Sequence, residues 1–311
     1  MTGVALPEPR TLASLAAELG GDVDAAAADL VVTRVAPIAG AGPGDLVPIT
    51  SSRGAAQAAG CAGVLLVERS LADRVAAGRR WVSPHAAWAL ASLLDGLAPR
   101  WASAPRGPAH VEPGADVAPD AVLGPGAVVL AGAVIGAATS VGPNAVVYGG
   151  VTLGRRVVVG AGAVLGRPGF GWVAGPDGAR RRMPQLGGVV VEDDVEIGPL
   201  ATVDAGTLGP TVLRRGVKLD AQVHVGHNVE IGEATIVAAQ TGFAGSVRVG
   251  QGVQVGGQVG VADHVTLGAF ARIAAKSGVI GDVPAGRTVA GYPAVDRARW
   301  LRGMARLLRR G

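Results

Sequence analysis

Residues 111–165 read VEPGADVAPDAVLGPGAVVLAGAVIGAATSVGPNAVVYGGVTLGRRVVVGAGAVL, and this stretch decides the fold. An apolar residue stands at every sixth position from Val111 to Leu165. The same spacing returns from Val191 to Val203, and again from Leu213 to Val279. A fixed period of six is the signature of a parallel β-helix built from hexapeptides. Neither a helical period of 3.6 nor strict alternation produces it.

Each hexapeptide combines one short β segment with one corner. The residue four places after each apolar anchor is small or β-branched, as at Ala127, Thr139 and Val217. Glycine often follows the anchor directly, where the chain must bend. Valine dominates because β-branched side chains suit a pleated stack. We therefore expect a mainly β protein in which the anchors point inward and equivalent residues stack in columns.

The six-residue period divides the chain into three parts. Residues 1–108 lack it and predict a small α/β domain with a helix at Thr11–Leu19, a buried strand at Gly63–Val67 and a helix at Pro84–Leu97. A proline-rich linker runs from Ala98 to Pro108. Residues 109–288 predict the β-helix, and residues 289–311 a short basic helix.

The repeat is interrupted twice. Leu165 and Val191 lie 26 positions apart where six are expected, and four extra residues separate Val203 from Leu213. Insertions into a solenoid must leave through its side, where they commonly form binding surfaces. The two insertions are therefore candidate parts of a functional site.

Composition favours an intracellular protein with a packed core. Hydrophobic residues make up 49% of the chain and are periodic, which excludes a disordered chain. The single cysteine, Cys61, excludes an intramolecular disulfide and suits a reducing compartment. Residues 1–20 lack a signal-peptide pattern, and no stretch of about 18 apolar residues occurs. The expected location is the cytoplasm, with no transmembrane segment.

Positive charge is concentrated although the net charge is only +4. One cluster is Arg180 to Arg182, and a second loads the C-terminus with Arg297, Arg299, Arg302, Arg306, Arg309 and Arg310. These arginines form either a solvated surface or a docking site for an acidic partner. Nucleic acid is disfavoured because no aromatic residues interleave the basic ones.

The second repeat run carries the candidate chemistry. His227 follows a corner glycine, and histidine is the usual general base near neutral pH. Gly245 lies 18 residues later, so its N–H is expected about one coil away, as an oxyanion donor near the base. His264 is expected beside the same column, and Asp220 could orient the imidazole.

Two other interpretations of the histidines stay open. His227 could be an ordinary surface residue of the β-helix. His224 and His227 with a third histidine could form a zinc site, although the two occupy different positions relative to their anchors and need not converge. We therefore predict no metal.

Several segments together resemble bacterial UDP-3-O-acylglucosamine N-acyltransferase, a hexapeptide-repeat acyltransferase family of lipid A biosynthesis. The resemblance extends over nearly the whole chain and is carried by segments 41–46, 169–172, 183–187, 191–198, 218–229 and 291–294. It implies a left-handed β-helix with three sides, a coil of about 18 residues, and a homotrimer with sites between subunits.

The resemblance also implies an activity. A 3-hydroxyacyl chain would move from acyl carrier protein to the 2-amino group of UDP-3-O-acylglucosamine. No cofactor is expected beyond the phosphopantetheine that the donor carries, and the acidic carrier protein would be the partner of the C-terminal arginines. By motif match, His227 is the base, Gly245 the oxyanion donor and Asp220 a further catalytic residue. The residues expected to bind substrate are His264, Phe170, Gln185 and Asn228.

The chain departs from this family at places that concern the nucleotide. Two aromatic residues that hold uracil in the family are replaced by Pro48 and Gly54, and the usual Asp-Arg-Gly is here Asp204-Ala205-Gly206. Pro168 replaces an acidic residue before Gly169. Two alternatives therefore remain: a divergent sugar-amine acyltransferase with another acceptor or an acetyl-CoA donor, and a non-catalytic scaffold that binds a sugar nucleotide.

Overall fold

The computed structural model describes residues 3–95, 108–174, 176, 178–291 and 302–306. The chain divides into two compact units, residues 1–99 and 100–311, which are considered separately. The linker predicted from Ala98 lies outside the described residues up to residue 107. The domain boundaries predicted at residues 108 and 288 stay predictions.

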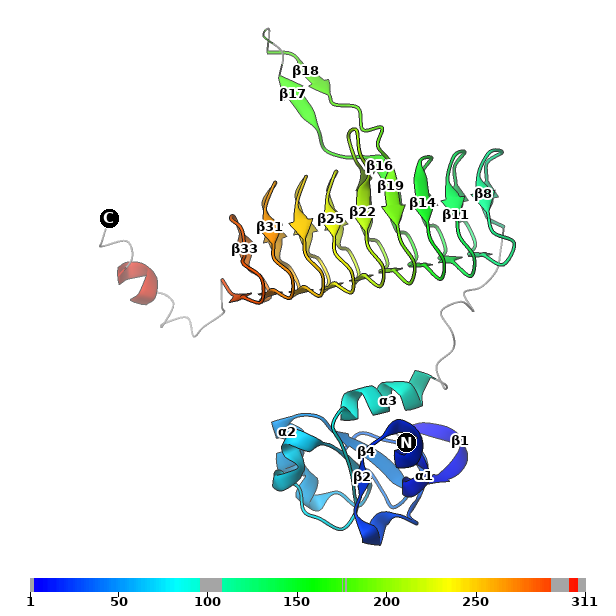
Figure 1. Cartoon of the computed structure of the whole chain (residues 1–311), viewed down its shortest axis with the longest axis vertical. Coiled ribbons are helices and arrows are strands. Elements are labelled where there is room, and N and C mark those ends of the chain that lie inside the picture. Colours follow the sequence, from blue (N-terminus) through cyan, green and yellow to red (C-terminus); the bar gives the residue numbers. More distant parts are fainter. Residues whose placement is uncertain (1–2, 96–107, 175, 177, 292–301, 307–311) are drawn as a thin grey trace. The chain divides into compact units, whose positions relative to one another are not determined.

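The N-terminal unit is a six-stranded sheet with helices on both faces (Figure 1). The strand order is β1-β3-β4-β5-β6-β2, with β3 to β6 parallel and the two edge strands antiparallel to their neighbours. The elements in chain order are β1 (Val4–Thr11), α1 (Leu12–Leu19), β2 (Asp22–Val23), η1 (Ala25–Ala27), β3 (Val31–Val35), β4 (Asp45–Ile49), α2 (Ser52–Gln57), η2 (Ala58–Gly60), β5 (Val64–Glu68), η3 (Arg69–Arg74), β6 (Arg80–Ser83) and α3 (Ala86–Asp95).

Local sequence explains these elements. The Thr11 side chain accepts a hydrogen bond from Ser14 N at 3.2 Å and so caps α1, which ends at Gly20 with φ 82°. Alternating strand residues serve two cores. Leu46 and Leu66 belong to the core beneath α1 and α3, whereas residues of opposite parity pack with Ala55 of α2. The predicted helices and strand are therefore confirmed, with starts that differ by one or two residues; the predicted end of the last helix at Leu97 lies outside the described residues.

The turn before β4 is held by an ion pair between the buried carboxylate of Asp45 and the partly exposed Arg34. The Asp45 carboxylate accepts hydrogen bonds from Arg34 Nε at 2.8 Å, from Arg34 Nη2 at 2.7 Å and from Gly42 N at 2.8 Å. The hydrogen bond from Arg34 holds the pKa of Asp45 below its usual value, because it stabilises the ionised form. Segment 41–46, which carries part of the family resemblance, thus has a structural role in this unit.

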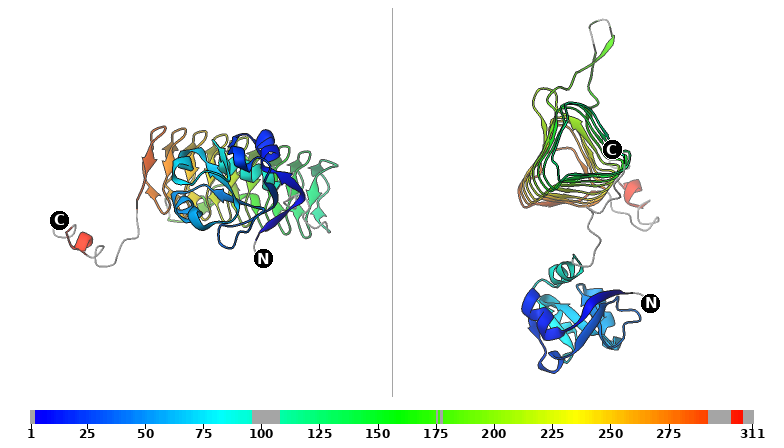
Figure 2. Two further views of the ribbon diagram at one scale, coloured as in Figure 1. Left: turned by 90° about the horizontal axis from the view of Figure 1, so that it is seen from below. Right: turned by 90° about the vertical axis from the view of Figure 1, so that its right-hand side faces the viewer.

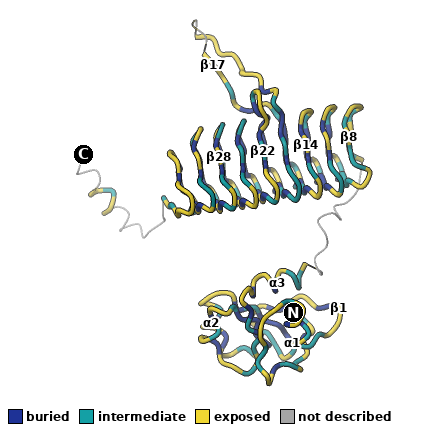
Figure 3. Tube along the Cα trace, in the orientation of Figure 1, coloured by how far each residue is buried: buried dark blue, intermediate teal, exposed yellow. Residues whose placement is uncertain are grey.

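The second unit is a parallel β-helix, as the period predicts, and it is left-handed, as the resemblance implies. Its strands stack into three parallel sheets, which form the sides of a triangular coil (Figure 2). Each strand pairs with the one 18 residues along where no insertion intervenes, as Val128 does with Val146. Residues that face inward are buried and those at the edges are exposed (Figure 3).

The strands of each side follow in chain order. The first side holds β7 (His110–Val111), β10 (Val128–Val129), β13 (Val146–Val147), β16 (Val164–Pro168), β21 (Thr202–Ala205), β24 (His224–Val225), β27 (Gly242–Phe243), β30 (Gly260–Val261) and β33 (Gly278–Val279). The second holds β8 (Asp116–Val117), β11 (Val134–Ile135), β14 (Val151–Leu153), β19 (Val189–Val191), β22 (Thr211–Leu213), β25 (Glu230–Ile231), β28 (Arg248–Val249) and β31 (Thr266–Leu267). The third holds β9 (Val122–Leu123), β12 (Ser140–Val141), β15 (Val158–Val159), β20 (Glu196–Ile197), β23 (Lys218–Leu219), β26 (Ile236–Val237), β29 (Gln254–Val255), β32 (Arg272–Ile273) and β34 (Thr288–Val289).

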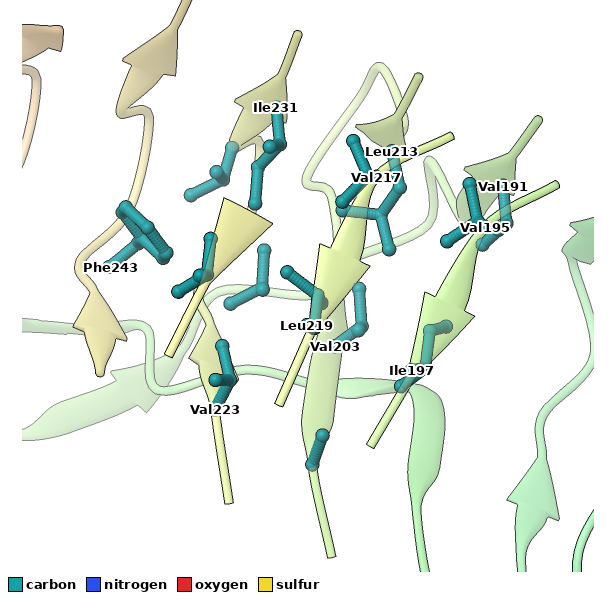
Figure 4. Packing of buried hydrophobic residues seen from close by; sticks show 14 of the residues in the cluster. Val191, Val195, Ile197, Val203, Leu213, Val217, Leu219, Val223, Ile231 and Phe243 are labelled. Atoms are coloured by element: carbon teal, nitrogen blue, oxygen red, sulfur yellow. The ribbon is translucent and has the colours of Figure 1, made fainter. Parts of the chain in front are cut away.

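The anchors form one continuous apolar column inside the coil. Ile197, Leu213, Val217, Leu219 and Phe243 lie at successive places along the apolar core (Figure 4), and all five are at most 2% exposed. A core with this few bulky side chains is narrow, which explains the predominance of valine and alanine at inward positions. Burial of these anchors is the main force that holds the coils in register.

Both insertions leave the coil at the same corner, between the first and second sides. The longer insertion contains β17 (Trp172–Ala174) and β18 (Arg180–Arg182), an antiparallel ribbon that projects from the β-helix (Figure 1). The shorter insertion lies between β21 and β22 and includes Leu208, which is 91% exposed. The insertions predicted from the broken period are therefore confirmed.

In the segment 289–311, predicted as a basic helix, residues 302–306 are helical, whereas Val289 ends strand β34 and residues 290–291 are not helical. Residues 292–301 and 307–311 lie outside the described residues. No helix in the part of the chain that the structure describes is long and apolar enough to cross a membrane.

Candidate active site

One corner of the β-helix collects most of the candidate residues. His227 lies two residues after the anchor of β24, at the corner between the first and second sides through which both insertions leave. Gly245 is the equivalent residue of the next coil, and the coils are joined by a hydrogen bond from Ser246 N to His227 O at 2.9 Å. The spacing of 18 residues therefore correctly predicted that His227 and Gly245 lie one coil apart.

The imidazole of His227 lies directly over Gly245. A Cβ atom added at Gly245 would come within 2.6 Å of both Cε1 and Nε2 of His227. Real Cβ contacts are never this short, so only glycine leaves room for the ring in this position. The close approach also brings the backbone of Gly245 beside the ring edge that carries Nε2.

Asn228 fixes the tautomer of His227. Its Oδ1 accepts from Thr207 N at 2.9 Å and its Nδ2 donates to Gly209 O at 2.9 Å, so the orientation of the amide is determined. His227 Nδ1 lies 3.2 Å from Oδ1, which is an acceptor, and must therefore carry the hydrogen. In the neutral ring Nε2 then has the free lone pair, which a general base requires.

The shorter insertion is what holds this amide. Thr207 and Gly209 both belong to it, and Thr211 Oγ1 accepts from Asn228 N at 2.9 Å where the chain re-enters the coil. Four extra residues thus fix the base through Asn228. The substrate-binding role predicted for Asn228 stays a prediction, and the structure adds this positioning role.

Gly245 also offers an available donor. Its N–H has no hydrogen-bond acceptor among the described residues, whereas Ala244 N and Ser246 N are bonded to Val261 O and His227 O. A free backbone N–H beside the base is the arrangement that can stabilise an oxyanion during acyl transfer.

A buried carboxylate, that of Asp204, lies beside His224, and no role for it was predicted from the sequence. Asp204 is 1% exposed; its Oδ1 lies 3.0 Å from Arg167 Nη2, and its Oδ2 lies 3.7 Å from His224 Nε2. His224 Nδ1 also lies 2.7 Å from Thr202 Oγ1. Burial raises the pKa of Asp204, and Coulombic attraction to His224, Arg167 and His227 opposes that rise.

The signal for Asp204 was present but ambiguous. An aspartate one place after a strand anchor more often bends the chain, and the six-residue spacing does not show that this one is buried. Gly169 packs against the carboxylate so closely that an added Cβ would lie 2.6 Å from Oδ2.

The longer insertion places Gln185 inside and Phe170 outside. Gln185 is 8% exposed and its Oε1 accepts from Gly169 N, while its buried Nε2 has no partner among the described residues. Phe170 is 84% exposed. The predicted substrate contacts of both residues stay predictions, but Gln185 joins the cluster around Asp204 through Gly169.

Asp220 lies at a different corner from the His227 imidazole, and His264 is linked to the His227 corner through its backbone. Asp220 stands at the corner between the third and first sides, where its carboxylate accepts from Ala221 N at 2.7 Å and Ala239 N at 3.1 Å. Within one chain the ring is therefore oriented by Asn228, and a catalytic role for Asp220 stays a prediction. His264 is exposed, and its N donates to Gly245 O at 3.1 Å.

The zinc interpretation has no support in the described residues, which contain no group of three or more histidine, cysteine, aspartate or glutamate side chains able to hold a metal ion. His224 is engaged instead with Thr202 and Asp204.

The fold and the corner around His227 indicate the class of protein. Residues 132–167 match the family model described as "Bacterial transferase hexapeptide (six repeats)". Among solved structures, UDP-N-acetylglucosamine acyltransferase from Campylobacter jejuni is 27% identical with a TM-score of 0.51, covering 57% of this chain and 67% of that one. The Francisella novicida enzyme of the same name, 24% identical with a TM-score of 0.52 over 63% of this chain and 71% of its own, supports the fold.

Curated relatives with similar sequences give a more specific comparison. A protein of Anaeromyxobacter sp. (strain Fw109-5) named UDP-3-O-acylglucosamine N-acyltransferase is 56% identical over 149 residues, which is 46% of this chain and 42% of the relative. One of the same name from Christiangramia forsetii is 51% identical over 85 residues, 27% of this chain and 25% of the relative. The resemblance predicted from the motifs is thus confirmed, although each match spans less than half of these relatives' length.

Proposed function

We propose that this chain is an N-acyltransferase that moves a 3-hydroxyacyl group to the 2-amino group of UDP-3-O-acylglucosamine. The observation that carries the proposal is the corner of His227, Asn228 and Gly245, where a base of fixed tautomer stands beside a free N–H. The names of the curated relatives supply the acceptor. The acyl donor is acyl carrier protein, which presents the chain as a thioester.

The geometry fits one sequence of steps. Nε2 of His227 removes a proton as the acceptor amine attacks the thioester carbonyl and the C–N bond forms. The carbonyl oxygen becomes an oxyanion, which accepts a hydrogen bond from the N–H of Gly245. The C–S bond then breaks, the amide is left, and the proton held by His227 passes to the departing thiolate. No metal or bound cofactor takes part.

The remaining features of the proposal concern assembly and location. The protein acts as a homotrimer in the cytoplasm, with the acyl carrier protein as its transient partner. Trimerisation would place further side chains beside a corner that one chain leaves partly exposed, and Phe170 is a candidate contact there.

The deciding experiment is product analysis with matched variants. Purified protein is incubated with UDP-3-O-acylglucosamine and either 3-hydroxyacyl carrier protein or acetyl-CoA, and products are identified by mass spectrometry. His227→Ala should reduce turnover by about 10² to 10⁴ with little change in melting temperature. His110→Ala, an exposed histidine on the same side of the coil, is the control.

Each outcome separates the alternatives. Transfer from acetyl-CoA alone would favour a different donor, and no transfer from either donor would favour the scaffold. Turnover in His227→Ala equal to that of the parent protein would remove the base from the mechanism.

A further inference from the structure

The two insertions concentrate exposed apolar side chains at one corner of the β-helix. Six large hydrophobic residues of these insertions are between 41% and 91% exposed: Phe170, Trp172, Val173, Met183, Leu186 and Leu208. The coil, in contrast, buries its anchors in one continuous core. An exposed cluster of large apolar side chains marks a site of contact with another protein or with a membrane.

The ribbon of β17 and β18 has no core of its own. It consists of three residue pairs, and all six residues are exposed. A two-stranded hairpin is marginally stable in water unless its side chains pack against something else. Because the ribbon projects from the coil (Figures 1 and 2), both of its faces are open to a partner.

Trp172 is held in place by an arginine of the opposite strand. Trp172 pairs with Arg182 in the ribbon, and the guanidinium carbon of Arg182 lies 4.9 Å from the centroid of the indole. Arg182 Nη1 also donates to Gly169 O at 3.2 Å. This cation–π contact orients the indole while leaving it 43% exposed. Arg182 therefore has a structural role within the ribbon.

The other two arginines of β18 are available. Arg180 and Arg181 are exposed and form no ion pair with an acidic side chain among the described residues. Segment 167–187 contains four arginines and one aspartate, so its net charge is +3. A partner of this ribbon must therefore be anionic as well as able to cover apolar side chains.

A second copy of this chain does not fit that description well. The acidic cluster of the β-helix is already paired within the chain: Arg214 contacts Glu192 and Glu230, and Arg215 contacts Glu233. A ribbon of three pairs is also small for a stable protein interface, which buries about 800 Å² on each partner.

A lipid surface requires no complementary shape. Tryptophan is favoured at the level of the lipid headgroups, and arginine is attracted to anionic lipids.

We infer that the β17–β18 ribbon docks the protein on an anionic lipid surface. Trp172 and Val173 enter the headgroup region, and Arg180 and Arg181 face the lipid phosphates. The ribbon leaves the coil at the corner that carries His227, so docking brings the candidate active site close to the lipid. The docking does not depend on the proposed reaction, although a product with two acyl chains would pass from such a site into a bilayer more readily than into water.

The test is co-sedimentation of the full-length protein with lipid vesicles at low salt, without substrate. The parent protein should bind vesicles of equal parts phosphatidylcholine and phosphatidylglycerol, and bind phosphatidylcholine alone much more weakly. The double variant Arg180→Gln/Arg181→Gln should lower the partition coefficient about 25-fold, because each arginine near the surface contributes about fivefold. Arg272→Gln/Arg287→Gln removes the same charge from exposed positions elsewhere on the β-helix and should change it by less than about twofold.

A second variant tests the apolar contribution. Trp172→Ala should weaken binding to the mixed vesicles about tenfold. Trp88→Ala removes another exposed tryptophan, in the N-terminal unit, and should leave binding unchanged. Equal binding to the two kinds of vesicle, or vesicle binding indifferent to Arg180 and Arg181, would overturn the inference.

Protein partners give different outcomes. If Arg180→Gln/Arg181→Gln weakens binding of acyl carrier protein, or changes the oligomeric mass, while vesicle binding is unchanged, the ribbon is a protein contact and the inference is wrong. Vesicle binding that requires the ribbon, in a protein without acyl transfer, would support the inference and refute the proposed function. Acyl transfer by a protein that does not bind vesicles would refute the inference alone.

Discussion

Asn228 connects the irregular part of the β-helix to its proposed chemistry. Its amide accepts from His227 and from the shorter insertion at the same oxygen, so the tautomer of the base depends on a loop that the hexapeptide pattern does not contain. Serine–histidine–aspartate enzymes set the tautomer of their histidine with a carboxylate. A neutral amide achieves the same orientation without adding charge beside the base.

The first prediction at this scale concerns Gly245. In Gly245→Ala the new methyl carbon would lie only 2.6 Å from His227 Nε2 and displace the ring, while the coil itself has no reason to unfold. We expect transfer activity to fall by about 10² or more and the melting temperature to stay within a few degrees. Steady-state kinetics and thermal melting on the same preparation check both.

Gly281 provides a matched control. It also lies two residues after an anchor of the first side, but an added Cβ there meets no atom within 4 Å in the described structure. Gly281→Ala should therefore leave activity intact. Equal losses in the two variants would mean that alanine is tolerated poorly at this corner in general, and the specific contact with His227 would be refuted.

Residue-level prediction from the sequence succeeded where position alone decides contact. His227 and Gly245 are one coil apart, and a fixed period makes them neighbours whatever their side chains are. It could not find the partners that insertions provide. Asn228 acquires its partners from the shorter insertion, whose path follows no period, and the side-chain contacts of Asp204 with Arg167 and His224 do not follow from spacing. Asp220, at another corner, hydrogen-bonds to backbone amides.

At the scale of one coil, a buried hydroxyl joins neighbouring turns. The Thr235 side chain is fully buried; its hydroxyl donates to Gly250 O at 2.9 Å and accepts from Val253 N at 3.2 Å. Thr139 and Thr241 make equivalent bonds to Gly154 O and Gly256 O. The pattern predicted a small or β-branched residue here, and the polar contact explains why threonine recurs at such positions.

The second prediction follows from these bonds. Thr235→Val keeps the shape of the side chain but leaves a buried carbonyl and a buried N–H without partners. We expect a loss of about 1–3 kcal/mol in unfolding free energy, measured by denaturant unfolding. Thr266→Val, on the exposed face of β31, should change stability by less than about 0.5 kcal/mol. Equal stability of Thr235→Val and the parent protein would show that these hydroxyls contribute no net stabilisation.

At the scale of the molecule, the sequence predicted architecture better than function. The period determines which residues are inside, so the β-helix and the exits of both insertions followed from spacing alone. The N-terminal unit followed from local signals such as the Thr11 cap. The sequence did not predict the hollow lined by Glu68, His85 and Trp88, because these residues come together only when the parallel strands align their carboxyl ends.

Charge is the property of the whole chain that bears on the donor. The net charge is +4, and the C-terminal arginines carry much of the local excess; Arg302 and Arg306 are exposed, and Arg309 lies outside the described residues. An acidic carrier protein would be drawn to such a surface by attraction that extends about 10 Å at 0.1 M salt.

The last prediction tests that attraction through its dependence on salt. Reversal of Arg302, Arg306 and Arg309 to glutamate should raise the KM for the acyl carrier protein about tenfold at low salt, with little change in kcat. The reason is that charges at the edge of an interface act chiefly on the rate of association. The difference from the parent protein should shrink as salt rises. Reversal of Arg53, Arg272 and Arg287, which form no ion pair among the described residues, changes net charge equally at other places. A rise in KM of the same size in both variants would assign the effect to total charge, and a KM indifferent to reversal and to salt would leave the C-terminal arginines as solvated surface.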